Sequence, residues 1–227
     1  MTGPFDHIEE ISKSNRFDHI VEVQKHNPYH DRLGRFTSGS GGMAIGMGVD
    51  GGAVGGKRAA VAGTLRDVER ANKDLDHEVA TIVNPQNGKV IFSKEGGAAG
   101  VSFNSSEARE IAGQVLTHNH PDDIIFSPSD VAMSYHLDTI RATNPDGTVY
   151  ELSGMNRRDA VLAYNEHYMA ARAQSFKDLG IAEGTRDREL QGAQRVGSFS
   201  AISDSCDKWL ADNATKYGYR YSKGRIE

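Results

Sequence analysis

Two histidines and an aspartate are spaced so that they could bind one metal ion. His118 and His120 stand two residues apart where a short buried strand is predicted to end. Because side chains alternate along a strand, both imidazoles should project from the same side of the chain. Asp130 follows His120 by ten residues and opens a predicted helix, so the chain can fold back and offer a carboxylate as third ligand. Such a set leaves one position of a zinc ion for water, the open form of catalytic zinc sites.

A hydrolytic zinc site also needs groups that are not ligands. Water on such a zinc ion has a pKa of about 7, but its proton still needs an acceptor. Glu78, at the start of a predicted core strand, is suited to accept that proton and pass it to a leaving amine. Ser127 precedes Asp130 by three residues and could hydrogen-bond the developing oxyanion. The expected catalytic residues are therefore Glu78 and Ser127.

Each of these residues also has a plainer interpretation. A His-x-His-Pro sequence at a strand end can be a turn with two solvated histidines. Ser127 and Asp130 are residue types that cap helices. The metal site is favoured because all the residues occur together, in order, and at the ends of predicted elements.

The sequence around the motif predicts short strands that alternate with helices. Strands are expected at residues 77–83, 89–93, 114–117 and 148–152, the first two forming a hairpin. Helices are expected at residues 64–75, after Ser105 and Ser106, and at 128–142, 158–179 and 203–217. This alternation predicts an α/β or α+β fold, a small mixed sheet flanked by helices.

The chain divides into four predicted segments. They are a polar arm at 1–37, a linker at 38–56, a metal-binding domain at 57–155 and a helical extension at 156–227. Nine of the nineteen residues of the linker are glycine, which predicts a flexible coil that lets the arm move independently of the core.

Composition narrows the possible partners and compartment. Twenty-six Lys and Arg against thirty-one Asp and Glu leave a net charge of −5, which disfavours nucleic acid as a partner. The single cysteine, Cys206, permits no internal disulfide, and no apolar run resembles a signal peptide, so we expect residence in a reducing cytoplasm. No stretch is apolar and long enough to predict a membrane span.

The motif residues resemble those of the JAMM (MPN-type) zinc metalloproteases, and most of all the RadC-like bacterial branch of that family. The family pattern is a glutamate on an early strand, then His-x-His-Pro, then Ser-x-x-Asp. It is matched here by Glu78, His118-Asn119-His120-Pro121 and Ser127-Pro128-Ser129-Asp130. The stretch from the second histidine to the serine is one residue shorter than in the commoner family pattern.

The resemblance covers about residues 75–153 and implies a JAMM/cytidine-deaminase-like core. It implies that His118, His120 and Asp130 bind Zn²⁺, with Glu78 as general acid/base and Ser127 supporting the tetrahedral intermediate. The implied activity is that of a metallopeptidase or isopeptidase that hydrolyses a peptide or isopeptide bond in a protein substrate.

A second resemblance concerns residues 26–38, which read HNPYHDRLGRFTS. Short segments of this kind occur in structural and head-assembly proteins of tailed phages. The resemblance implies a phage-encoded protein that contacts phage structural proteins through its N-terminal arm, in the host cytoplasm or in a virion. The alternative function is therefore a phage structural or head-assembly protein whose JAMM-like domain is a binding or vestigial module.

Overall fold

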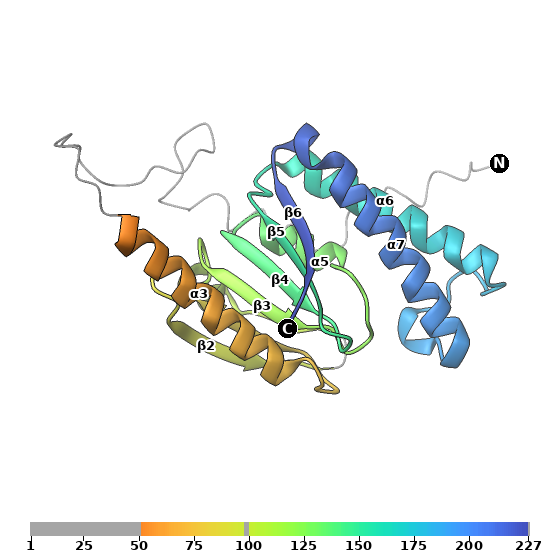
Figure 1. The fold of residues 1–227 in the computed structure, drawn as a ribbon. Helices are drawn as coiled ribbons and strands as arrows, with labels where there is room; N and C mark the ends of the chain where they lie inside the picture. Colours follow the sequence, from red (N-terminus) through yellow and green to blue (C-terminus); the bar gives the residue numbers. More distant parts are fainter. Residues whose placement is uncertain (1–50, 98–99, 227) are drawn as a thin grey trace. The chain divides into compact units, whose positions relative to one another are not determined.

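The computed structural model describes residues 51–97 and 100–226 and shows a mixed α/β fold (Figure 1). Six strands form one sheet in the order β2-β1-β3-β4-β5-β6. Their bounds are β1 Val79–Val83, β2 Val90–Glu95, β3 Val115–Asn119, β4 Thr139–Thr143, β5 Thr148–Ser153 and β6 Arg220–Arg225. Since β3 and β4 run parallel and all other neighbours antiparallel, the predicted mixed sheet is confirmed.

The order of the strands explains how the motif residues come together. The predicted hairpin is confirmed as β1 and β2, which pair antiparallel, and β1 also pairs with β3. Parallel strands need a crossover connection, and here residues 120–138 cross over between β3 and β4. That crossover contains helix α5, Pro128–Ser134, so the loop and helix carrying the motif start at the end of β3.

Helices lie on both faces of the sheet (Figure 1). Helix α3, Gly51–Asn72, packs on β1 and β3, where Leu65, Val83 and Val115 form a buried cluster. Helix α5 packs on β4 and against α6, Arg158–Asp178, which pairs with α7, Gly192–Tyr217. Within residues 51–97 and 100–226, the remaining short helices are α4, Ser105–Glu110, and the 3₁₀ turn η1, Asp187–Glu189.

A partly buried ionic network joins α3 to the sheet. Glu69 of α3 is 2% exposed, and its Oε1 lies 2.5 Å from Nε of Arg141 on β4. The same oxygen accepts a 3.0 Å hydrogen bond from the hydroxyl of Thr117 on β3, and Arg141 also pairs with Glu151 on β5. Opposite charges and a hydroxyl donor therefore compensate the burial of Glu69.

The prediction of a helix at 128–142 is wrong for the second half of that range. Helix α5 ends at Ser134, and Thr139–Thr143 form β4, a central strand with Ile140 and Ala142 buried. No glycine or proline marks the end of α5, so the sequence gives no stop signal there. Pairing of β4 on both edges overrides the local pattern.

The extension predicted to be helical at 156–227 also contains a strand, β6, which the sequence did not predict. It pairs along its whole length with β5 and forms one edge of the sheet. Most of its residues are polar and exposed, so it lacks the apolar alternation that identifies strands in a sequence.

The structure has a helix in each predicted region, but several helices begin or end at other residues than predicted. Helix α3 starts at Gly51, so the last six residues of the predicted linker are helical, whereas residues 1–37 and 38–50 lie outside the described residues. Helix α4 is confirmed, with Asn104 as its N-cap, and α7 begins eleven residues before the expected Ser203. Within the described ranges, no helix has the length and apolar character to cross a membrane.

Candidate metal centre

The two histidines lie at the end of the central strand β3. His118 is within the strand, and the backbone N–H of His120 donates to the carbonyl of Thr143 at the end of β4, 2.9 Å away. Their Nε2 atoms face each other at 2.8 Å, and the residues are only 5% and 3% exposed. The alternative of a turn with two solvated histidines is therefore wrong.

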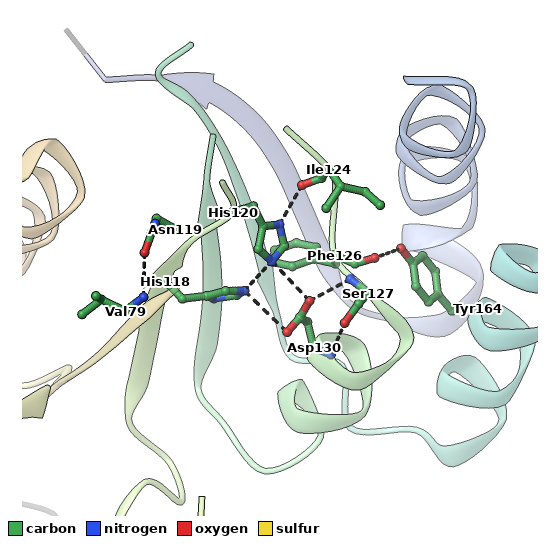
Figure 2. Close-up of polar contacts among 9 residues, drawn as sticks. All are labelled: Val79, His118, Asn119, His120, Ile124, Phe126, Ser127, Asp130 and Tyr164. Atoms are coloured by element: carbon green, nitrogen blue, oxygen red, sulfur yellow. Dashed lines mark hydrogen bonds and ion pairs between the residues drawn. The ribbon is translucent and has the colours of Figure 1, made fainter. Parts of the chain in front are cut away.

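Asp130 reaches the histidines from the first turn of α5 (Figure 2). Its Oδ2 accepts a 2.7 Å hydrogen bond from the backbone N–H of Ser127, which aims the carboxylate. Oδ1 then lies 3.5 Å from Nε2 of His118, and Oδ2 lies 3.5 Å from Nε2 of His120. The structure thus brings together the three residues predicted as ligands.

The donor atoms fit a single metal ion. One ligand atom from each of the three residues lies within 4.8 Å of the other two. Tetrahedral zinc with ligands at about 2.0–2.1 Å would hold them about 3.3 Å apart, and the closest separations here are 2.8 and 3.5 Å. His118, His120 and Asp130 could therefore hold a metal ion.

The tautomer of His120 also fits metal binding. Its Nδ1 lies 2.7 Å from the carbonyl oxygen of Ile124. Because a carbonyl oxygen only accepts hydrogen bonds, Nδ1 must carry the proton. In neutral His120, Nε2 then has a free lone pair, which faces the possible metal-binding atoms of His118 and Asp130. Nδ1 of His118 has no hydrogen-bond partner among the residues that the structure describes.

The electrostatics of the three residues keep Asp130 ionised. Burial raises the pKa of Asp130, but the charges and hydrogen bonds of His118 and His120 outweigh it and hold the pKa well below its ordinary value. Burial lowers the pKa of His120, and Asp130 and Glu78 more than reverse this effect. An ionised carboxylate thus lies beside two imidazoles, and these are ligand types that zinc accepts.

Glu78 lies close enough to His118 and His120 to interact with them electrostatically. Ala80 of β1 is opposite His118 in the antiparallel register, and Glu78 precedes Ala80 by two residues, directly before β1 begins. Burial raises the pKa of Glu78, and the nearby His120 and His118 oppose that rise without cancelling it. A half-buried carboxyl with a raised pKa, outside the ligand set, is suited to acid/base chemistry.

Ser127 is the N-cap of α5, as its plainer interpretation predicts. Its Oγ accepts a hydrogen bond from the backbone N–H of Asp130 at 3.3 Å, which completes a capping box. The cap uses a lone pair of the hydroxyl oxygen, so the hydroxyl proton can still be donated. The two interpretations of Ser127 are therefore compatible.

The C-terminal helices hold the loop that carries the site, which the sequence did not reveal. Tyr164 of α6 donates a 2.5 Å hydrogen bond to the carbonyl of Phe126, and Ser203 of α7 accepts one from the N–H of Ile125 at 3.1 Å. Both anchoring residues are buried. Neither belongs to a motif, and only the long-range packing of α6 and α7 shows their role.

Comparisons of the chain with protein-family models, with curated proteins and with solved structures found no match. The resemblance to the JAMM family therefore remains a prediction carried by the motif residues.

Proposed function

We propose that this protein is a zinc-dependent metallopeptidase or isopeptidase that hydrolyses a peptide or isopeptide bond in a protein substrate. One observation carries the proposal: the donor atoms of His118, His120 and Asp130 converge, with Glu78, a carboxyl outside this group, close enough to interact with all three electrostatically. Structural zinc sites are closed by four protein ligands, whereas the described residues offer three here. The arrangement therefore supports catalysis.

The donor set supports zinc as the metal. Two imidazole nitrogens and one carboxylate oxygen match the ligands of zinc hydrolases, while calcium and magnesium prefer oxygen ligands alone. When bound, zinc would supply Lewis-acid activation of the substrate carbonyl and of water.

The protein's own groups then have separate tasks. His118, His120 and Asp130 hold the metal, and the capping hydrogen bond from the Ser127 N–H keeps the aspartate aimed. The Glu78 carboxylate takes the proton of the attacking water and delivers it to the leaving amine. The Ser127 hydroxyl donates to the oxyanion that develops on the substrate carbonyl.

The proposed substrate is a phage or host polypeptide, docked through the N-terminal arm. This part of the proposal depends on the phage-like segment at residues 26–38, which lies outside the described residues.

The test compares wild type with Glu78→Gln on lysates of the natural host. Mass spectrometry should find new protein termini with wild type, and Glu78→Gln should produce them about 10²–10⁴-fold more slowly while binding the same amount of zinc. Glu110→Gln, which changes an exposed glutamate of α4, is the matched control and should act like wild type. Identical termini with wild type and Glu78→Gln would contradict the proposal.

A further inference from the structure

The residue between the two histidines makes contacts that the motif does not explain. Asn119 is 1% exposed, and its side chain reaches across to the chain that leads into β1. Its Oδ1 accepts a 2.7 Å hydrogen bond from the backbone N–H of Val79, and its Nδ2 donates a 2.8 Å bond to the carbonyl oxygen of His77. Figure 2 shows the contact with Val79.

These two hydrogen bonds fix the backbone on both sides of Glu78. The carbonyl of His77 belongs to the peptide that precedes Glu78, and the N–H of Val79 belongs to the peptide that follows it. Because φ and ψ of a residue are set by the orientation of its two flanking peptides, Asn119 holds the Glu78 backbone in one conformation.

The peptides of Glu78 are also held from the β2 side. The N–H of Glu78 donates to the carbonyl of Gly97 at 3.1 Å, and the N–H of Gly96 donates to the carbonyl of Glu78 at 2.8 Å. The Glu78 backbone is thus bonded to β2 and its following turn on one side and to Asn119 on the other. Of these contacts, only those of Asn119 link Glu78 to the strand end that carries the histidines.

We propose that Asn119 is a positioning residue, which holds the acid/base Glu78 in a fixed relation to His118 and His120. The inference rests on the proposed function and adds a residue to which that function assigned no role. Asparagine suits the position because its amide offers a donor and an acceptor side by side. Aspartate keeps the acceptor but would face the His77 carbonyl with a second oxygen, and alanine removes both contacts.

The test measures kcat, KM and zinc content for Asn119→Ala and Asn119→Asp on a substrate whose cleavage depends on Glu78. We expect kcat to fall on the order of 10²-fold, as for misplacement of a catalytic group, with zinc per chain and KM unchanged. If Asn119→Ala does not fold, the same three quantities are measured on the isosteric variant Asn119→Asp. Thr117→Val removes another buried hydrogen bond of β3, on the α3 face, and should leave kcat unchanged.

Combination with Glu78→Gln separates positioning from general damage. If Asn119 acts through Glu78, the Asn119→Asp change should cause no further loss of kcat in the Glu78→Gln background. Multiplicative losses, or a wild-type kcat in both Asn119 variants, would overturn the inference while the proposed function stands.

Amide exchange gives a readout that needs no activity. Exchange at Val79 should be faster in Asn119→Ala than in wild type and unchanged in Thr117→Val, because only the former loses the acceptor of that N–H. Equal protection of Val79 in all three proteins would refute the hydrogen bond itself. Cleavage that does not depend on Glu78 would instead refute the proposed function, and the role of Asn119 with it.

Discussion

Each face of strand β3 packs against a carboxylate, Glu69 on one face and Asp130 on the other, and the two carboxylates have different partners. On the α3 face, Glu69 contacts Arg141 and Thr117, so each negative oxygen meets a cation or a hydroxyl donor. On the other face, Asp130 meets two imidazoles, and the donor atoms of all three residues converge on one point. Thr117 and His118 are adjacent in β3, and one contacts Glu69 while the other contacts Asp130. The different surroundings of the two carboxylates therefore come from the side chains packed against each face and not from the strand.

The difference separates an ion-pair network from a candidate metal site. A carboxylate paired with arginine stabilises the packing of a helix on the sheet but has little capacity left for a metal ion. Converging lone pairs of histidine and aspartate are costly to bury unless a cation joins them. Replacing the carboxylate by an amide should therefore remove metal binding on one face, at Asp130, and lower the free energy of unfolding on the other, at Glu69.

The largest effect is expected from Asp130→Asn. The amide keeps the size of the side chain but removes the anionic ligand, so the variant should lose both bound zinc and all Glu78-dependent cleavage. Zinc content by elemental analysis and cleavage of the same substrate check this. Full zinc occupancy in Asp130→Asn would mean that Asp130 is not a ligand.

Ser127→Ala should have an intermediate effect on turnover. Loss of one oxyanion donor lowers turnover on the order of 10²-fold, and loss of the cap costs about 1 kcal/mol of unfolding free energy. Zinc content should stay at the wild-type level. Single-turnover rates and urea unfolding measure the two effects separately, and lost stability with unchanged turnover would leave Ser127 as a helix cap alone.

Glu69→Gln should affect stability and leave the chemistry intact. The amide cannot pair with the Arg141 charge in the buried position, so the free energy of unfolding should fall by about 1–3 kcal/mol. Urea titration measures the loss, while zinc content and turnover should match wild type. Loss of zinc in folded Glu69→Gln would show that the two faces are coupled.

The clustering of His118, His120 and Asp130 could be predicted from the sequence because these residues lie close together along the chain and at the ends of elements. His118 and His120 share a face by strand alternation alone, and the serine and proline before Asp130 mark the start of α5. These local rules predict that the three side chains converge without reference to any long-range contact.

What the sequence did not predict depends on contacts between distant segments. Strand β6 forms by pairing with β5, and the end of α5 follows from the pairing of β4 with its two neighbours. The bonds from Asn119 to residues 77 and 79 join segments forty residues apart. Local propensity carries no information about such partners.

Elemental analysis after reconstitution with zinc shows whether His118, His120 and Asp130 bind one zinc ion per chain, as we propose. Wild-type protein should hold about one zinc per chain, and the double variant His118→Ala/His120→Ala should hold none, because it lacks both imidazole ligands. Wild-type protein that takes up no zinc, or a double variant with wild-type stoichiometry, would contradict the account.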